Sequence, residues 1–406
     1  MLWMESRWNG RVASSLCVGL MTASLVACGG GSGEDATASS EGEASESGET
    51  TAEGGDLPAA LPERIAVTAD FKAQSLSILD AEALLNASAG TTAAEVVVDT
   101  IDLGAWAPGP LEVEFIPGTR EVLVSVSPGF FGSVVGGLIM AGEVDPGGAL
   151  LRVDLESREV TGTLTRDVPP MGIAVTADGS TAYVADFGNE DQRGNTVSIV
   201  DLESFTVTGD VVVGSGPEQL DLSSDGTKLI VNAAGPGTVR TFELADPSGS
   251  LSEPLSVSGD PSWVSFVEGS DQAVVTNSSD PANWMVVDFT DPGAPAILAE
   301  GDAVSGFPYA LTHVAGQEWI MTSMTVGRFE WHEISVDGAS STNAATHTIE
   351  GITVFPLGIA VDATAGKLVV PMAGVDALGV IDIETEALVQ IDWVGAPGPT
   401  YVVLEG

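Results

Sequence analysis

One stretch of sequence decides the fold: residues 170–186 read PMGIAVTADGSTAYVAD, and residues 195–203 read NTVSIVDLE. Apolar residues alternate with polar ones on both sides of Asp178-Gly179, which is typical of two strands joined by a tight hairpin. An Asp-Gly pair at that position predicts a type I′ turn. A third strand ends at Asp201, and residues 206–213 (TVTGDVVV) form a fourth. The stretch therefore predicts a unit of four short antiparallel strands.

This unit recurs along the chain at intervals of 43 to 60 residues. A proline precedes or opens each first strand, at Pro110, Pro170, Pro217, Pro261, Pro308, Pro356 and Pro399. An acidic residue ends each third strand, at Asp80, Asp154, Asp201, Glu243, Asp288, Glu333 and Asp382. Repeated four-stranded units of this length are typical of β-propeller blades, so the repeat predicts seven blades.

The two ends of the repeat region complement each other. The chain ends at residues 400–406 (TYVVLEG), where a first strand would turn into its second, and residues 64–70 (RIAVTAD) resemble a second strand that lacks its first. We expect the C-terminal strand to complete the first blade, which leaves no unpaired edge inside the ring. The fold class predicted for residues 58–406 is therefore all-β, a closed seven-bladed β-propeller. An open β-solenoid and a two-domain β protein fit this complementarity less well.

The repeat resembles that of the YVTN family of β-propellers. The signature stretch is present as residues 183–186 (YVAD) and, more loosely, as residues 230–232 (IVN) and 274–277 (VVTN). The resemblance implies a propeller related to those of surface-layer and lactonase-like proteins. It does not choose among an enzyme, a binding protein and a structural envelope protein.

The first 27 residues have the pattern of a secretion signal. Arg7 and Arg11 precede an apolar segment, residues 12–26, that is short for a membrane span. Residues 25–28 (LVAC) resemble the bacterial lipobox, which implies cleavage before Cys28 and attachment of a lipid to its thiol. Gly29 and Gly30 follow, with no aspartate, which resembles outer-membrane sorting in Gram-negative lipoproteins. We therefore expect an exported lipoprotein anchored in a membrane, with the outer membrane favoured.

Residues 28–57 are expected to form a flexible tether. Beyond Cys28 they consist largely of Gly, Ser, Thr, Ala and Glu, and they contain eight acidic residues, no basic residue and no aromatic residue. Such a segment has little apolar surface to bury, and its charges repel one another. The predicted organisation is a signal peptide, a lipidated tether and one propeller.

The net charge excludes one class of partner. The chain has 13 Lys and Arg against 58 Asp and Glu, a formal charge of −45. A polyanion of this kind repels nucleic-acid phosphates, so nucleic-acid binding is not expected. The thin distribution of cations also disfavours phosphorylated substrates. We expect a monomeric propeller.

Catalytic and cofactor motifs are scarce. No P-loop, Gly-x-Ser-x-Gly or haem-attachment motif occurs, and the three histidines, His313, His332 and His347, share no metal-ligand spacing. The loop at residues 186–195 is rich in oxygen donors and would suit Ca²⁺, although a solvated loop is the favoured interpretation. The sequence requires no cofactor and singles out no catalytic residue.

The candidate ligand site is the channel end at which the innermost strands begin. Carboxylates, amides and aromatic rings gather there, and such a mouth could bind a cation, a sugar or a peptide. The alternative, which we favour, is structural: acids and amides cap strand ends and rings fill the channel. The ligand-binding candidates are Glu112, Asp186, Glu218, Asn232, Trp263, Asn277, Tyr309 and Tyr401.

An insertion at residues 127–149 gives a second candidate surface. It is unusually apolar for a loop, so it could dock a partner or pack on its own blade. The partner-contact candidates are Phe130, Phe131, Leu138, Ile139 and Met140. The first functional hypothesis is a lipid-anchored, non-enzymatic binding or scaffold protein of the cell envelope. The alternative is a hydrolase or lactonase that uses Glu112, Glu218 and Asp186, with or without a divalent cation.

Overall fold

The computed structural model describes residues 59–128, 147–189, 192–257, 259–279, 282–325, 327–352, 356–393 and 398–406. The signal-like segment, Cys28 and the acidic tether lie outside these residues. The partner-contact candidates Phe130, Phe131, Leu138, Ile139 and Met140 lie outside them too. The described residues therefore belong to the propeller alone.

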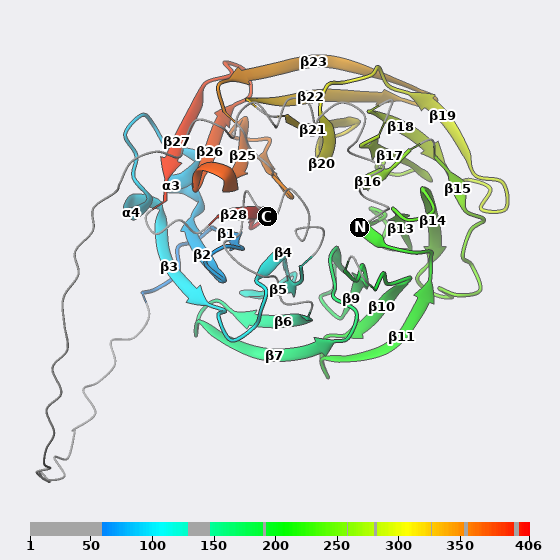
Figure 1. Ribbon diagram of the computed structural model, residues 1–406, viewed down its shortest axis with the longest axis horizontal. Helices are drawn as coiled ribbons and strands as arrows, with labels where there is room; N and C mark the ends of the chain where they lie inside the picture. Colours follow the sequence, from blue (N-terminus) through cyan, green and yellow to red (C-terminus); the bar gives the residue numbers. More distant parts are fainter. Residues whose placement is uncertain are drawn as a thin grey trace, which may run out of the picture. The chain divides into compact units, whose positions relative to one another are not determined.

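In this part of the chain the strands form seven four-stranded antiparallel sheets, arranged as blades around a central channel (Figure 1). The predicted seven-bladed β-propeller is confirmed. Each blade runs outward from an innermost strand at the channel to a fourth strand at the rim.

Blades 1 to 4 use the first half of the chain and its last strand. Blade 1 contains β28 (Pro399–Leu404), β1 (Ile65–Asp70), β2 (Ser75–Asp80) and β3 (Val97–Asp102). Blade 2 contains β4 (Pro110–Phe115), β5 (Glu121–Val126), β6 (Gly148–Asp154) and β7 (Glu159–Arg166). Blade 3 contains β8 (Ile173–Val175), β9 (Thr181–Ala185), β10 (Thr196–Asp201) and β11 (Thr206–Val212). Blade 4 contains β12 (Pro217–Leu222), β13 (Lys228–Ala233), β14 (Thr238–Glu243) and β15 (Leu255–Ser256).

Blades 5 to 7 complete the ring. Blade 5 contains β16 (Pro261–Phe266), β17 (Gln272–Asn277), β18 (Asn283–Asp288) and β19 (Ala296–Glu300). Blade 6 contains β20 (Phe307–Ala315), β21 (Glu318–Thr325), β22 (Arg328–Asp337) and β23 (Ser340–Glu350). Blade 7 contains β24 (Ala360–Asp362), β25 (Lys367–Met372), β26 (Ala377–Asp382) and β27 (Leu388–Asp392).

The ring closes as the sequence predicts. The C-terminal strand β28 pairs antiparallel with β1, so that Val67 faces Val403 and Thr68 faces Val402. Side chains reinforce the joint, because Glu405 Oε2 accepts hydrogen bonds from Ile65 N at 3.1 Å and Arg120 Nη1 at 2.8 Å. The two ends of the propeller therefore share one sheet, and β1 has a partner on each side.

The hairpin turns differ from the predicted type I′ geometry. A type I′ turn requires a positive φ at both central residues. In blade 3 Gly179 has a φ of 67°, whereas Asp178 is not among the residues with positive φ. Gly179 N donates to Thr176 O at 2.8 Å, and the Asp178 carboxylate accepts from Thr176 Oγ1 and Ser180 N. The aspartate therefore caps the turn from the side, and only the glycine is left-handed.

Two local features were not predicted. Strand β22 continues past Glu333 to Asp337, and its partner β23 has 11 residues, so blade 6 is longer than the repeat suggests. Between β2 and β3 the chain forms two short helices, α3 (Ala81–Leu85) and α4 (Ala93–Val96). Their apolar residues pack against blades 1 and 7. Among the described residues no helix is long and apolar enough to cross a membrane.

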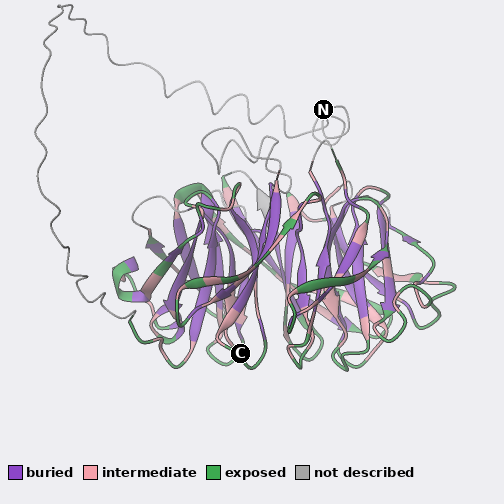
Figure 2. Ribbon diagram, turned by 90° about the horizontal axis from the view of Figure 1, so that it is seen from below, coloured by how far each residue is buried: buried purple, intermediate pink, exposed green. Residues whose placement is uncertain are grey.

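The hydrophobic core lies between neighbouring blades, where alternate side chains of adjacent sheets interlock. One cluster joins blades 5 and 6 through the fully buried Trp284 and Trp319. Similar clusters join other neighbouring pairs, so that the inner strands are buried, while outermost strands and loops carry most of the exposed residues (Figure 2). This arrangement leaves the channel to be filled or lined by side chains of the innermost strands.

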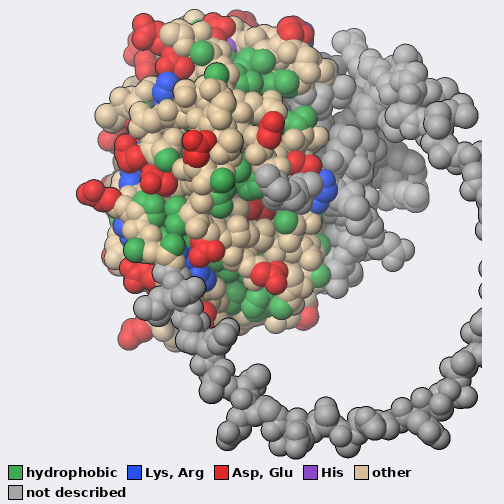
Figure 3. Space-filling view, turned by 90° about the vertical axis from the view of Figure 1, so that its left-hand side faces the viewer, with side chains coloured by type: hydrophobic (Ala, Val, Ile, Leu, Met, Phe, Trp, Pro, Cys, Tyr) green, Lys and Arg blue, Asp and Glu red, His purple; other side chains and the backbone are tan. Residues whose placement is uncertain are grey.

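The acidic surplus is distributed over the propeller surface, where Asp and Glu outnumber Lys and Arg in the view of Figure 3. Most cations of the propeller are already held by carboxylates. The ion pairs are Arg64–Asp362, Lys72–Asp376, Arg120–Glu405, Arg152–Glu121, Arg158–Asp99, Arg166–Asp186, Lys228–Asp271, Arg328–Glu330 and Lys367–Asp382. Few cations are therefore available to a ligand.

Candidate functional site

The channel has two unlike ends. We call the end where the innermost strands begin, at Pro110, Pro217, Pro261 and Pro399, the start face. We call the opposite end, where these strands turn into their blades, the hairpin face. The sequence placed its candidate ligand site at the start face.

At the start face the predicted aromatic residues Trp263, Tyr309 and Tyr401 come together on the inner wall of the channel. The rings of Trp263 and Tyr401 are stacked with centroids 6.3 Å apart, and Tyr309 meets Trp263 edge to face at 5.8 Å. Tyr309 is fully buried and Tyr401 is buried, while Trp263 is half-buried. These contacts come from three different blades, so the rings stabilise the inner wall of the propeller.

Two predicted carboxyl groups, those of Glu112 and Glu218, form hydrogen bonds with tyrosines of this cluster. Glu218 Oε1 accepts a hydrogen bond from the Tyr309 hydroxyl at 2.8 Å, and both residues are buried. Glu112 Oε1 accepts from Ile173 N at 2.9 Å, and Glu112 Oε2 accepts from Gln219 Nε2 at 3.0 Å. The hydroxyl of Tyr401 also hydrogen-bonds to Glu112. Glu112 of blade 2 and Glu218 of blade 4 therefore form hydrogen bonds with residues of other blades.

Asp186 lies within blade 3 and does not line the channel cavity. Its carboxylate pairs with Arg166 and accepts hydrogen bonds from Thr196 Oγ1 and Ser198 Oγ, both at 2.7 Å. The residue is buried, and its carboxylate contacts side chains of its own blade and Arg166 of β7 in blade 2. The structure gives Asp186 a place in the packing of the blade, apart from Glu112 and Glu218.

The predicted amides connect neighbouring strands and blades. Asn232 accepts a hydrogen bond from Gln219 N at 2.9 Å and donates one to Pro261 O at 2.7 Å. Asn277 accepts from Asp260 N at 2.7 Å and donates to the side chain of Asn283 at 3.1 Å. Both amides are fully buried, and neither lines the channel cavity.

The channel cavity has a volume of about 1290 Å³, and Trp263 and Tyr401 of the aromatic cluster form part of its wall. Glu112, Gln219, Trp263 and Tyr401 line its inner end, and its wall continues to residues of the hairpin face. The residues reached there are Gly118, Ser224, Glu268 and Gly406. The cavity therefore extends toward the hairpin face, the end opposite to that selected from the sequence.

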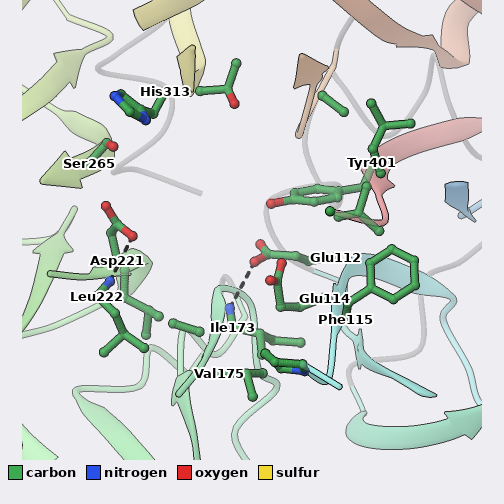
Figure 4. Close-up of a pocket in the computed structure, with 18 of the residues that line it drawn as sticks. Glu112, Glu114, Phe115, Ile173, Val175, Asp221, Leu222, Ser265, His313 and Tyr401 are labelled. Carbon is green, nitrogen blue, oxygen red and sulfur yellow. Dashed lines mark hydrogen bonds between the residues drawn. The ribbon is translucent and has the colours of Figure 1, made fainter. Parts of the chain in front are cut away.

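Polar side chains project into this cavity from opposite sides (Figure 4). Glu112 and Glu114 come from β4, and Asp221 comes from β12 across the channel. Ser265 and His313 lie on the side of Asp221, and Tyr401 lies beside the glutamates. We call Glu112, Glu114 and Asp221 the channel carboxyls.

Glu114 and Asp221 were missed at the level of sequence, because only the first residues of each innermost strand were considered there. A signal was present, since both acids lie four residues after the proline that opens their innermost strand, Pro110 or Pro217, and no other blade carries an acid at that position. His313 was assigned to an innermost strand but was interpreted as structural. Which of these positions face an open space depends on how side chains from all the blades fill the channel.

The channel carboxyls have displaced pKa values. Burial raises the pKa of Glu112 to about 8, although hydrogen bonds from Ile173 N, Gln219 and Tyr401 oppose the shift. Burial, with the nearby charges of Glu112 and Asp221, raises the pKa of Glu114 to about 8. Neutral carboxylic acids at pH 7 can donate as well as accept hydrogen bonds.

Asp221 differs from the two glutamates. Burial raises its pKa to about 6, and backbone N–H groups, Ser265 and His313 limit the rise. Phe266 N and Leu222 N each donate to one carboxylate oxygen at 2.8 Å. At neutral pH Asp221 is therefore mainly ionised, while the glutamates opposite are mainly protonated.

The Glu114→Gln variant should lose part of the pH dependence of stability. The pKa of Glu114 is higher in the folded protein than in the unfolded chain. Its contribution to the free energy of unfolding is therefore complete below about pH 4.5 and is lost as the pH rises through about 8. Glutamine does not titrate. We expect similar free energies of unfolding at about pH 5 and a variant more stable by a few kcal/mol at about pH 9, at roughly 1.4 kcal/mol per pKa unit.

Chemical denaturation at both pH values measures this difference. The matched control is Glu159→Gln, which removes an exposed acid from β7 of the same blade. Equal pH profiles for Glu114→Gln and the wild type would contradict the assignment of a raised pKa to Glu114.

The cavity offers little to an anion or to a single metal ion. Of the lysines and arginines that the structure describes, Arg120 alone lines it, and its guanidinium donates to Glu405 Oε2 at 2.8 Å and Glu63 O at 2.7 Å. No group of three or more His, Cys, Asp and Glu side chains within the described ranges could hold one metal ion.

The fold and the cavity define a closed seven-bladed propeller with an acidic, aromatic-lined channel. Solved structures share this fold at low sequence identity. A protein of unknown function from Desulfotomaculum acetoxidans is 13% identical with a TM-score of 0.63, and the match covers 84% of this chain and 98% of that one. The periplasmic gluconolactonase of Pseudomonas aeruginosa is 15% identical with a TM-score of 0.60, covering 84% and 99%.

A further structural neighbour has a related name. A protein from Bacteroides uniformis, provisionally assigned as a 6-phosphogluconolactonase, is 12% identical with a TM-score of 0.61, covering 85% of this chain and all of that one. No protein-family model matches the chain, and no curated protein matches it. At these identities the likeness concerns the fold, so the propeller has lactonase-like structural neighbours and the function must be argued from its own site.

Proposed function

We propose that the propeller binds a polar small molecule, neutral or cationic, in its channel cavity. The observation that carries this proposal is the cavity of about 1290 Å³, which is lined by three channel carboxyls and aromatic side chains and by one arginine that is already paired. Ligand sites of proteins are typically cavities of this kind, with a few convergent polar groups and displaced pKa values. The shortage of cations disfavours phosphorylated ligands.

A ligand panel tests this function. We expect thermal stabilisation of the purified protein by members of a set of neutral sugars, glucono-δ-lactone and alkyl amines, and none by 6-phosphogluconate. Asp221→Asn should reduce the stabilisation, and Asp210→Asn, which changes an exposed acid on β11, should not. If only the sugar phosphate binds, or if both variants respond like the wild type, the proposal is wrong.

Hydrolysis is a second candidate, favoured by the unlike protonation of the carboxyls on opposite sides of the channel. With a neutral lactone between them, Asp221 would accept a proton from a water molecule whose oxygen attacks the carbonyl carbon. A protonated Glu114 would donate its proton to the ring oxygen as the ester bond breaks, which gives a hydroxy acid. The names of two structural neighbours are consistent with this chemistry. Glucono-δ-lactone turnover that Asp221→Asn abolishes would support it, and the absence of turnover by the wild type would reject it.

The place of the protein in the cell is a further part of the proposal. The signal-like residues and the lipobox-like tail support an exported protein of the YVTN type that is held to a membrane by a lipid on Cys28. A Cys28→Ala variant should then leave the membrane fraction, and its retention there would contradict lipid anchoring. A scaffold role through Phe130, Phe131 and the other partner-contact candidates remains a proposal for a second surface.

A further inference from the structure

We propose that the ligand of the channel cavity is an organic dication of the linear diamine class, held between the two glutamates of β4 and Asp221 of β12. This inference rests on the proposed function, because it assigns a ligand class to the same cavity. It goes beyond that function by excluding neutral sugars as the preferred ligand and by predicting that binding is coupled to proton release.

The charge of the cavity wall favours a cation. The wall brings acids from several elements, whereas its arginine, Arg120, already donates to Glu405 and to the carbonyl of Glu63. A cationic ligand would neutralise carboxylates that repel one another when they ionise, as Glu112, Glu114 and Asp221 do. Walls of low dielectric constant around a site of one sign of charge also concentrate ligands of the opposite charge.

Among the channel carboxyls, Glu114 is the one whose hydrogen-bonding capacity a ligand would satisfy. Its side chain lines the cavity and points into it (Figure 4). Among the described residues its carboxyl group has no hydrogen-bond or ion-pair partner, in contrast to Glu112 and Asp221. A carboxyl group removed from water without a partner is costly, and hydrogen bonds between an ionised donor and an ionised acceptor are the strong ones. An ammonium group supplies three such donors.

The acceptors lie on both sides of the channel. Asp221 faces the glutamates from the opposite wall (Figure 4), and no group of three or more His, Cys, Asp and Glu side chains among the described residues could hold one metal ion. A ligand with two ammonium groups joined by an alkyl chain offers one such group to each wall. Phe266 N and Leu222 N fix the Asp221 carboxylate in place. Beside the glutamates, the stacked rings of Trp263 and Tyr401 offer faces for an ammonium group or its alkyl chain.

Binding should release protons. An ammonium group binds ionised carboxylates, but Glu112 and Glu114, with pKa values of about 8, are mostly protonated at neutral pH. Asp221, with a pKa of about 6, has mostly lost its proton at that pH. Other titratable and charged groups of the lining are Arg120, Glu268, His313, Tyr401 and Glu405, while the lining residues of β8, β16 and β24 carry no charge.

The sign of the pH dependence follows from this linkage. Below about pH 8 each glutamate that binds an ammonium group must first lose its proton, so affinity should rise with pH. The gain is at most about tenfold per pH unit for each proton released, and it should level off above about pH 8. A ligand that binds through hydroxyl groups would show the opposite dependence or none, because protonated glutamates are hydrogen-bond donors.

Isothermal titration calorimetry of the full chain with 1,4-diaminobutane tests the inference. Titrations at about pH 6, 7, 8 and 9, each in two buffers with unlike ionisation enthalpies, give the affinity and the number of protons released. We expect tightening from about pH 6 to 8 with net proton release. Glu114→Gln and Asp221→Asn should each weaken binding about tenfold or more, whereas Glu159→Gln should bind like the wild type. Thermal unfolding establishes that each variant is folded.

The outcomes separate this inference from the proposed function. If myo-inositol or a neutral lactone binds and 1,4-diaminobutane does not, the dication inference fails and the ligand-binding function stands. If no member of the panel binds, both fail. Binding of 1,4-diaminobutane with equal affinity to all the variants, or tighter binding at low pH, also overturns the inference. Displacement of the diamine by Ca²⁺ at equal concentration would show that the site prefers a metal ion, which also overturns the inference.

Discussion

A chain that ends at Gly398 is expected to lose cooperative folding. Removal of residues 399–406 deletes β28 and leaves β1 without its inner partner, although every residue of β1 is buried. Buried backbone groups without partners cost about 1–3 kcal/mol each, and loss of the buried Tyr401 and Val402 adds roughly 1.5–3 kcal/mol apiece. These losses together reach the whole stability of an ordinary domain, about 5–15 kcal/mol.

Circular dichroism during thermal unfolding measures the effect of the truncation. The full chain should show one cooperative transition, and the truncated chain should show none. Deletion of Gly406 alone is the matched control, because a side chain added at this position would meet no neighbouring atom. A synthetic peptide of residues 398–406 should restore part of the transition. Truncated protein that unfolds at the wild-type midpoint would show that ring closure contributes little.

The second large effect is expected at Asp186. The Asp186→Ala variant leaves the half-buried Arg166, whose side chain is 15% exposed, without its carboxylate partner, and among the described residues only Ser198 Oγ still accepts from the guanidinium, at 2.6 Å. Breaking a buried ion pair from one side costs about 3–5 kcal/mol. Ser198 and Thr196 lose their acceptor as well, which offsets the partial exposure of Arg166, so the loss of stability should lie within about that range.

Urea denaturation of a variant set tests this assignment. Asp186→Ala should be strongly destabilised, whereas Asp210→Asn, on the exposed outer strand of the same blade, should be neutral. The double variant Asp186→Ala/Arg166→Met should recover part of the loss because the unpaired cation is gone. If Asp186→Ala instead retains wild-type stability and loses ligand binding, Asp186 belongs to the ligand site.

The fold could be predicted because its determinants are local and repeated. Prolines at strand starts and glycines in hairpin turns recur along the chain. The C-terminal stretch supplies the first strand that the N-terminal blade lacks. The turn type was wrong because Asp178 uses its side chain to cap the turn without entering the left-handed region. Helices α3 and α4 were missed, since they are short and depend on packing against blades 1 and 7.

The candidate site could be predicted only in part. The sequence brought Glu112, Trp263 and Tyr401 to one end of the channel, and these residues do line the inner end of the cavity. It could not show that the rings of Tyr309 and Tyr401 each pack against Trp263. Nor could it show that the open space continues toward Glu114 and Asp221, because that depends on side chains from blades far apart in sequence.

The central claim, that the channel cavity is the ligand site and takes a cation, is tested most directly by a crystal structure. Crystals of the full chain grown with 1,4-diaminobutane at about pH 8 should show electron density across the channel from Glu114 to Asp221. One nitrogen should lie within hydrogen-bond distance of each carboxylate. Density for the diamine only on the outer surface, with a channel that holds none, would contradict the claim.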